Sequence, residues 1–429
     1  MSCNEWQTIR LGDVIECIID NRGKTPPVET IGFELIETAS LVGDNKYPNF
    51  EKITKYVSKE TYNNWFRKGH PKVDDILIAL VGANMGNICI VNEERGCIAQ
   101  NLVALRMDTS KCNPNFIYYF ISSDEIQQIL KNWNRGSAQP SLKISDLVKL
   151  EFKLPPLEEQ EKIASILSSL DDKIELNNEM NKTLEEMAQS IFKRWFVDFE
   201  FPNEDGQPYK SSGGDMVDSE LGRIPKGWEV KTLGDTDIVI EDGDRGKNYP
   251  KKSELLKSGY CPFLNNKNII DDKISLVDSD FITEERHNLL RKGTININDI
   301  ILTTRGSVGN IGIFNKYLGY EFARINSGMI IIKNKEDFNL MYLYQLLKTP
   351  LMKEQYKSMS TGTAQPQLPI KDIKKLKILK PDKSIQDKIG NLLSSIYDLV
   401  FSNDQESLNI SIKRDLLLPK LMSGEISVN

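Results

Sequence analysis

The sequence has little of the chemistry that most catalytic and metal sites need. Its 429 residues include only two histidines, His70 and His287, and these do not correspond under the internal repeat described below. A duplicated His-based triad or metal centre is therefore excluded, and we predict no metal site. The six cysteines contain no C-x-x-C pair. We expect reduced, mostly buried thiols and no disulfide framework.

Long apolar runs and nucleotide-binding glycine motifs are also missing. No run approaches the roughly 20 apolar residues that span a bilayer, so we expect no membrane association. The start, MSCNEWQTIRLGD, lacks the basic and then apolar pattern of a secretion signal, which favours the cytoplasm. The glycines Gly82, Gly86, Gly306 and Gly309 fit neither G-x-G-x-x-G nor a P-loop, and we expect them in turns beside strands.

Two DNA-modifying chemistries lack their residues as well. Pro155-Pro156 lies between two leucines, unlike the Asn/Asp-Pro-Pro-aromatic loop of amino-methylating enzymes. Asp387-Lys388 lacks the spacer of an Asp/Glu-x-Lys cleavage motif and falls in a predicted helix. We therefore predict no catalytic residue and no cofactor in this chain.

The charge distribution leaves room for a polyanion. The net charge is -6, but residues 158–199 hold 5 Lys and Arg against 10 Asp and Glu, whereas residues 229–380 hold 24 against 19. The front of the second half is thus positive. This pattern permits a phosphate-facing surface without demonstrating one.

The most informative positive feature is an internal repeat. Residues 136–174 return at 362–400 with a constant offset of 226. The front of each copy repeats more loosely, as in Trp6 to Asp13 against Trp228 to Asp235. One unit has been duplicated, and its front has diverged while its back has kept register. We infer that the two fronts have varied functions and that the backs share one.

Each back half carries a heptad pattern of apolar residues with a polar centre. Two such helices can bury their stripes on each other as an intramolecular coiled coil, each seam being roughly 48 Å long at 1.5 Å per residue. The polar centres, which we expect to meet, fix register but not direction. The intervening linker favours an antiparallel pair because a parallel one requires a longer return path. The predicted seam consists of Ile163, Leu167, Leu170, Ile174, Asn177, Asn181 and Leu184, and of Ile389, Leu393, Ile396, Val400, Asn403, Ser407 and Ile410.

The fronts read as α/β domains, because short β-rich runs bounded by Gly, Asn and Asp precede helical stretches. The fold class is therefore α/β, with two globular domains and two long helices in a pseudo-two-fold repeat, one domain at each end of a rod. We expect the linker, rich in Gly, Pro and Ser, to be irregular. The expected segments are domain 1 at 1–153, helix 1 at 154–199, the linker at 200–228, domain 2 at 229–380 and helix 2 at 381–429.

Polar loops of both fronts carry donors that suit phosphates and base edges. A basic loop alone is more often a solvated surface, and recurrence in both copies is what favours contact. Asn21, Ser137 and Thr363 lie in the same loops. The candidates are Arg22, Lys24, Asn84, Asn87, Arg135 and Gln139 in the first copy, and Arg245, Lys247, Arg305, Ser307, Asn310 and Gln365 in the second.

In this order, the motifs resemble one family, the specificity subunits of type I restriction-modification enzymes. They are the tract from Leu154 to Phe199, the link SELGRIPKGWEV, the two W-x-x-x-x-LGD openings, the G-[ST]-AQP segments and the closing LLLPKLMSGEI. The likeness covers essentially the whole chain. The second helix departs from the first, since it has LLLPKLMSG where the first has the aromatic KRWFVDFEF.

The resemblance implies a non-catalytic subunit that recognises double-stranded DNA. Each front would be a target-recognition domain for one half of an asymmetric bipartite target. The helices would space the half-sites and bind two modification subunits, which would carry S-adenosylmethionine. Restriction subunits, joined through that complex, would use ATP and Mg²⁺.

Two alternatives remain open. One is a two-headed scaffold whose coiled coil spaces protein-binding domains, with no DNA specificity. The other is a stand-alone methylating nuclease, which the missing motifs disfavour. Failure to bind any duplex would favour the first, and methyl transfer by the isolated chain would favour the second.

Overall fold

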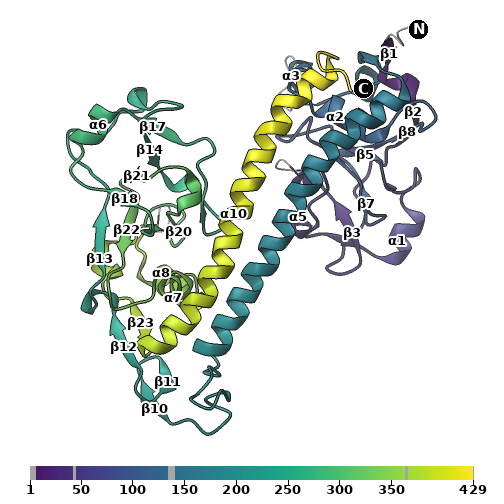
Figure 1. The fold of residues 1–429 in the computed structure, drawn as a ribbon. Helices are drawn as coiled ribbons and strands as arrows, with labels where there is room; N and C mark the ends of the chain where they lie inside the picture. The colour runs from purple at the N-terminus through teal and green to yellow at the C-terminus, as the bar shows by residue number, and fades with distance from the viewer. Residues whose placement is uncertain (1–5, 42–44, 134–140, 363–365, 429) are drawn as a thin grey trace. The chain divides into compact units, whose positions relative to one another are not determined.

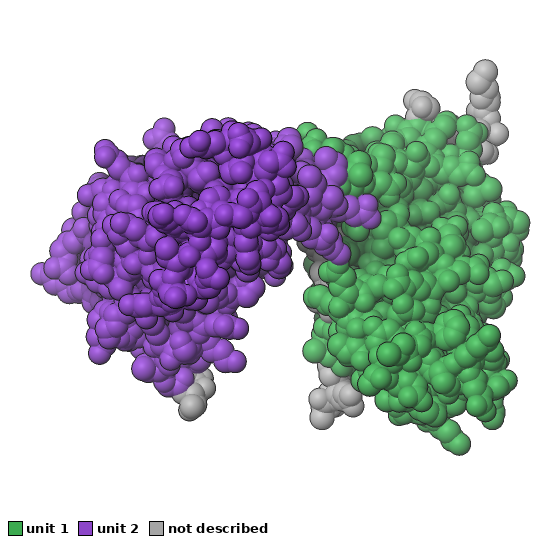
Figure 2. All heavy atoms as spheres, turned by 90° about the horizontal axis from the view of Figure 1, so that it is seen from below, with its two compact units in different colours: residues 1–177, 406–429 green, residues 178–405 purple. Residues whose placement is uncertain are grey.

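The chain forms two compact units. A computed structural model describes residues 6–41, 45–133, 141–362 and 366–428. Unit 1 combines residues 1–177 with residues 406–429, and unit 2 is the continuous stretch 178–405 (Figure 2). Each unit therefore holds one α/β domain together with part of each long helix.

The centre of unit 1 is an antiparallel four-stranded sheet in the order β2-β8-β5-β6. All four side chains of β5 are fully buried, and successive ones point to opposite faces of the sheet. Ile76 and Ile78 pack in the cluster that contains the helix α2, whereas Leu77 and Ala79 pack in the cluster of the second sheet. The sheet strands are β2 (Ile15–Ile19), β5 (Ile76–Ala79), β6 (Ile88–Ile90) and β8 (Leu102–Met107).

Smaller elements complete unit 1. The second sheet has the order β4-β3-β7, and β1 pairs with β9. The remaining strands of unit 1 are β1 (Gln7–Arg10), β3 (Phe33–Ile36), β4 (Tyr56–Val57), β7 (Cys97–Ile98) and β9 (Glu151–Leu154). Its short helices are α1 (Lys59–Asn64), α2 (Pro114–Ser122), α3 (Asp124–Asn132) and α4 (Ile144–Leu147), with 3-10 turns at Leu11–Val14, Thr38–Leu41 and Phe50–Lys52.

Unit 2 repeats this architecture. Its central sheet has the order β13-β22-β19-β20, and its second sheet has the order β17-β14-β21-β18. Ile300 and Leu302 pack toward the cluster of the helix α7, while Ile301 packs on the opposite face. The central strands are β13 (Val239–Asp242), β19 (Ile300–Thr303), β20 (Ile311–Ile313) and β22 (Met329–Lys333).

The other elements of unit 2 follow the order in unit 1 with additions, since β15, β16 and β18 have no counterpart among the strands that the described residues of unit 1 form. The strands are β12 (Glu229–Thr232), β14 (Cys261–Leu264), β15 (Ile269–Ile270), β16 (Lys273–Ile274), β17 (Asp280–Ile282), β18 (Thr294–Asn296), β21 (Phe322–Ile325) and β23 (Lys377–Lys380). The helices are α6 (Glu284–Leu289), α7 (Leu340–Leu347), α8 (Pro350–Met359) and α9 (Ile370–Ile373), with 3-10 turns at Leu233–Asp235, Lys252–Glu254, Asn266–Asn268 and Lys316–Leu318. The predicted α/β class of both fronts is confirmed.

Two helices of 40 residues each, α5 (Leu157–Phe196) and α10 (Lys383–Met422), carry the predicted heptads. Within each unit, part of α5 lies beside part of α10 (Figure 1). In unit 1, Asp171 pairs with Arg414 and Asn177 with Ser407. The residue numbers of α10 therefore decrease as those of α5 increase along the contact. The antiparallel prediction is confirmed there.

The polar centres of the two seams meet as predicted. In unit 1, Asn177 Nδ2 donates to Ser407 Oγ at 3.2 Å. In unit 2, Asn403 Nδ2 donates to Asn181 Oδ1 at 2.9 Å, and Asn181 Nδ2 donates to Asp404. Because these amides are paired, their burial does not leave isolated polar groups in the seam.

The apolar seam residues also bury the domains. Ile163 and Leu167 belong to the core of unit 1 together with Phe116 and Tyr119. Ile389 and Leu393 belong to the core of unit 2 together with Tyr342 and other aromatic side chains. Each helix segment therefore joins a domain to the other helix.

The expectation of an irregular linker holds for residues 200–215, which form no helix or strand, and is wrong for the residues that follow. Residues 216–225 form a hairpin of β10 (Met216–Ser219) and β11 (Gly222–Pro225). Before it, Phe201 stacks on Trp228 with ring centroids 4.8 Å apart and on Tyr209 at 4.6 Å. Trp228 also lies 5.6 Å from Phe196 at the end of α5. These aromatic contacts order a segment that its Gly, Pro and Ser content does not.

Most of the described cysteines are buried in the fold, and both histidines stack or pack against aromatic rings. Cys89, Cys97, Cys112 and Cys261 are buried free thiols, and Cys17 is an exposed one. The His70 ring stacks on Tyr62 with centroids 3.7 Å apart, and the His287 ring lies 4.8 Å from that of Phe322. Over the described ranges, no helix is both long and apolar enough to cross a membrane.

Candidate nucleic-acid interface

In unit 2, three loops meet at one edge of the central sheet. The register pairs Asp242 with Ile330 and Thr303 with Met329, so the ends of β13 and β19 lie beside the start of β22. The loops 243–248, 304–310 and 326–328 leave from this edge. Thr304 N donates to Gly328 O at 2.8 Å, and Arg245 Nη2 donates to Ser327 O at 3.3 Å. These two hydrogen bonds tie the loops together.

Arg305 lies in the middle of this edge. Its side chain is half-buried, its backbone forms a β-bridge with Gln367, and its carbonyl accepts a hydrogen bond from Asn266 Nδ2. No carboxylate within the described ranges forms an ion pair with it. Ser307 and Gly306, beside it, are exposed. A fixed backbone with an unneutralised guanidinium suits the bidentate reading of a guanine edge.

Unit 1 builds the same edge with other side chains. There β2, β8, β5 and β6 take the places of β13, β22, β19 and β20. Val81 bridges to Ser141 as Arg305 bridges to Gln367, and Leu80 N donates to Asn101 O as Thr304 N donates to Gly328 O. The two edges therefore share a backbone but differ at position 81 and 305, apolar in one and cationic in the other.

Three of the predicted amides are engaged inside the fold. Asn87 Nδ2 donates to Leu41 O at 2.8 Å, and Asn310, at the same place in unit 2, donates to Ile269 O at 3.4 Å. Asn84 Nδ2 donates to Thr38 O at 3.3 Å. These bonds hold the loops of the edge to the 3-10 turn Thr38–Leu41 in unit 1 and to the start of β15 in unit 2, a structural role that a contact with DNA does not require.

The loops NRGK and DRGK are anchored by their first residue. Asn21 and Asp244 are 7% and 3% exposed. Lys68 N donates to Asn21 Oδ1 at 3.0 Å, and Arg291 N donates to Asp244 Oδ2 at 2.9 Å. The Arg291 backbone N–H lowers the pKa of Asp244 despite burial. The residues that follow these anchors, including the predicted Lys24 and Lys247, are exposed.

Arg22 is already paired. It contacts Asp20 through Nε at 2.8 Å and Nη2 at 2.7 Å, and these bonds lower the pKa of the Asp20 carboxyl. Arg245 makes a looser pair with Asp242 at 3.9 Å. A phosphate has to compete with these carboxylates, more strongly at Arg22 than at Arg245.

Four cations beside these loops were missed from the sequence: Arg67, Lys68, Arg291 and Lys292. They belong to two R-K-G turns, 67–69 and 291–293, whose offset of 224 matches that of the neighbouring strands. The repeat itself is the signal that identifies them. The predicted Arg135, Gln139 and Gln365, with Ser137 and Thr363, lie outside the described residues.

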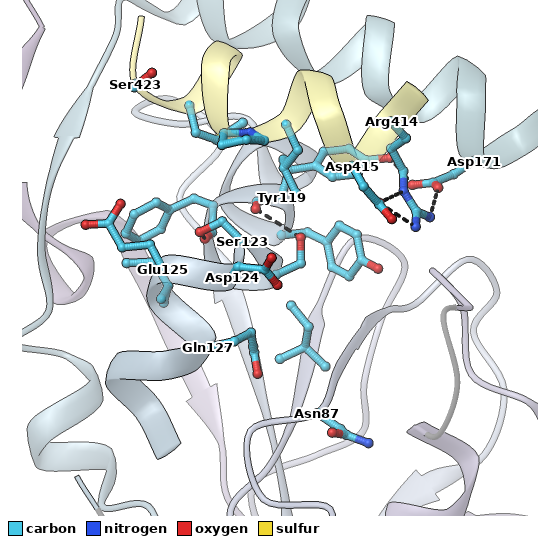
Figure 3. Close-up of a pocket in the computed structure, with 18 of the residues that line it drawn as sticks. Asn87, Tyr119, Ser123, Asp124, Glu125, Gln127, Asp171, Arg414, Asp415 and Ser423 are labelled. Carbon is cyan, nitrogen blue, oxygen red and sulfur yellow. Dashed lines mark hydrogen bonds and ion pairs between the residues drawn. The ribbon is translucent and has the colours of Figure 1, made fainter. Parts of the chain in front are cut away.

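A pocket of about 560 Å³ in unit 1 has a different character. It lies between the α2 to α3 junction and the end of α10 and is lined by Asp124, Glu125 and Asp415. Arg414 lies between Asp171 and Asp415, at 2.6 and 2.9 Å (Figure 3). Because its carboxylates outnumber its one guanidinium, the pocket disfavours a polyanion. The described residues contain no cluster of His, Cys, Asp and Glu that could hold a metal ion.

Comparison with known proteins gives a consistent result. The family described as "Type I restriction modification DNA specificity domain" matches the chain twice, at residues 4–186 and 225–413. The MjaIX specificity subunit of a type I restriction enzyme from Methanocaldococcus jannaschii is 33% identical over 316 residues, which cover 73% of this chain and 69% of the relative.

Two further similarities span nearly the whole chain. The MjaVIII specificity subunit of the same organism is 26% identical over 435 residues, covering 99% of this chain and 93% of the relative. The crystal structure of a type I restriction-modification S subunit from M. genitalium has a TM-score of 0.58 at 18% identity, covering 98% of this chain and 97% of that one. At this identity the structural match speaks for the fold alone.

Proposed function

The chain belongs to the specificity subunits of type I restriction-modification enzymes, a non-catalytic component, and from this premise we propose that each α/β domain reads one half of a bipartite duplex target. The observation that carries the proposal is that both units build the loop edge on the same backbone arrangement but with different side chains. Val81 in unit 1 and Arg305 in unit 2 occupy the same bridge position. Two readers that differ in this way recognise different half-sites, so the target is asymmetric.

The paired helices serve as the spacer and as the docking surface for two modification subunits. Both helices expose apolar side chains although the domains and the other helix cover their seams. In unit 1 these include Ile166 and Leu176, and in unit 2 they include Leu392 and Leu399, between 39% and 53% exposed. Exposed aliphatic rows on a long helix favour burial by a helical partner. The modification subunits bring S-adenosylmethionine, and restriction subunits join through them with ATP and Mg²⁺.

The test is to map modified bases in cells that contain the modification subunits, with and without this chain. We expect one motif with two different half-sites and a fixed gap, modified only when the chain is present. A palindromic motif would refute the assignment of different half-sites. An unchanged pattern, with no duplex binding by the assembled complex, would instead favour the protein-binding scaffold.

A further inference from the structure

Each unit places an R-K-G turn against the N/D-R-G-K loop. Gly69 and Gly293, which end the turns, both have positive φ, at 81° and 86°. A Cβ on Gly293 would lie 3.0 Å from Gly243 Cα, so this turn approaches the loop too closely for a side chain. The positive φ recurs at the same place in both domains, whereas the close approach is particular to unit 2, since a Cβ on Gly69 would meet nothing within 4 Å.

The anchors tie the turns to the loops. Asn21 accepts from Lys68 N and donates to Gly69 O, each at 3.0 Å. Asp244 accepts from Arg291 N at 2.9 Å and from Gly246 N at 2.7 Å. Two segments far apart in sequence are thereby held together, and each carries a pair of cations. The cations are Arg22, Lys24, Arg67 and Lys68 in unit 1, and Arg245, Lys247, Arg291 and Lys292 in unit 2.

The cluster adjoins the proposed reading edge. The loops 21–24 and 244–247 follow β2 and β13, the edge strands of the two central sheets. In unit 2 the Arg245 guanidinium donates to Ser327 O, and the next residue, Gly328, has its carbonyl bonded to Thr304, the neighbour of Arg305. Cations and reading loop thus form one continuous surface within the unit.

The two clusters differ in how far they are neutralised. In unit 1 the anchor is a neutral amide, and within the described residues Lys24, Arg67 and Lys68 form no ion pair. In unit 2 the anchor is a carboxylate that Arg291 approaches at 3.6 Å, and Lys292 pairs with Asp242. Of the four cations in unit 2, only Lys247 forms no ion pair within the described residues.

We propose that these clusters are twin contacts for the DNA backbone phosphates, sequence-independent, and stronger in unit 1 than in unit 2. This inference rests on the proposed function. A cation without a carboxylate partner can neutralise a phosphate directly, and this releases the counterions condensed on the DNA, whereas the paired cations of unit 2 must first give up Asp242 and Asp244. Each cluster positions the duplex so that the adjacent edge reads the bases.

The experiment measures binding of duplex by the full chain with its modification subunits as salt is raised from 50 to 200 mM. For Arg67→Ala/Lys68→Ala we expect the slope of log K against log salt to fall by about 1.8, at about 0.9 per phosphate contact. The salt-induced loss of affinity would then be about 12-fold smaller than for the unmodified chain. Target and non-target duplexes should weaken alike, so their affinity ratio should not change.

Three variants serve as controls. Arg291→Ala/Lys292→Ala, in the neutralised cluster, should lower the slope by less than the unit 1 variant. Arg223→Ala/Lys226→Ala removes two exposed cations, one in β11 and one directly after it, and should leave the slope unchanged. Asn21→Asp adds the carboxylate of unit 2 but gives up the Nδ2 bond to Gly69 O, so with an unchanged melting temperature it should lower the slope without removing a cation.

The outcomes separate the two proposals. If the unmodified complex binds duplex and Arg67→Ala/Lys68→Ala keeps its slope, the phosphate contact is refuted while the proposed function stands. A loss confined to the target duplex would also refute it, because the cations would then read sequence. If the unmodified complex binds no duplex, the proposed function fails and this inference fails with it. Unchanged melting temperatures establish that the variants are folded.

Discussion

At the scale of single residues, position 81 in unit 1 and position 305 in unit 2 carry the clearest chemical difference between the two reading edges. We expect Arg305→Ala to cost about 1–3 kcal/mol of binding for the half-site that unit 2 reads, through loss of a bidentate contact. Affinities for duplexes changed in one half-site at a time measure this effect. Val81→Ala, at the matched position, should leave that half-site unaffected. Uniform weakening across all sequences would mean that Arg305 contacts phosphate.

The Asp244 anchor predicts a pH dependence of stability. Its pKa is lowered in the folded chain, chiefly by the Arg291 N–H, so its contribution is present above the unfolded value of about 3.9. The contribution is lost as pH falls through the lower, folded pKa. We expect Asp244→Asn to lower the unfolding free energy of unit 2 at pH 6, and the difference from the unmodified chain to shrink below pH 4. Urea unfolding at several pH values measures it, and a constant difference would contradict the expectation.

Residue types alone led only part of the way to the site. Recurrence in both copies favoured Asn87 and Asn310 as DNA contacts, yet both amides donate to a backbone carbonyl inside the fold, that of Leu41 and that of Ile269. A fold that is built twice repeats its internal bonds, so recurrence selects structural residues as readily as binding ones. Of the diverged pair Val81 and Arg305, only Arg305 was predicted as a contact residue. Their equivalence is already visible in the repeat, at the offset of 224 that also relates Asp75 to Asp299, and the β-bridges agree with it.

At the scale of elements, the polar layer between α5 and α10 should matter for stability. Asn181 is 3% exposed and bonded to both Asn403 and Asp404. Asn181→Leu would remove its hydrogen bonds to the half-buried Asn403 and Asp404, and at about 0.5–1.5 kcal/mol for each bond we expect the unfolding free energy of unit 2 to fall by about 1–3 kcal/mol. The double variant Asn181→Leu/Asn403→Leu should recover part of that loss. A double-mutant cycle by urea unfolding measures the coupling, and purely additive losses would argue against it.

The elements also show where prediction from sequence succeeds and where it fails. Fully apolar runs bounded by Gly and Asp, such as residues 76–79, give strands because both faces are covered. The heptads give α5 and α10, polar layer included. The linker was misjudged because its order comes from Phe201, Tyr209 and Trp228 stacking near the end of α5. Such packing joins residues whose spacing in the sequence has no period.

At the scale of the whole molecule, duplication predicts paired docking of modification subunits. Ile166 and Leu392 are related by the offset of 226 and are 39% and 42% exposed, one in each unit. We expect Ile166→Asp and Leu392→Asp each to reduce the bound modification subunits from two to one, and the double variant to none. Native mass spectrometry gives the stoichiometry. Lys153→Asp, at an exposed position on β9 and outside α5, should keep both subunits. Loss of both subunits in either single variant would contradict independent docking.

The discontinuity of unit 1 bears on the order in which the chain folds as it is synthesised. Unit 2 is one continuous stretch, so all of its residues are available once position 405 has left the ribosome. Unit 1 needs residues 406–429, and Leu421, 2% exposed, fills part of its core. Although residues 1–177 are made first, their domain is completed last. In the interval its uncovered core is the part of the nascent chain most open to aggregation and to chaperones.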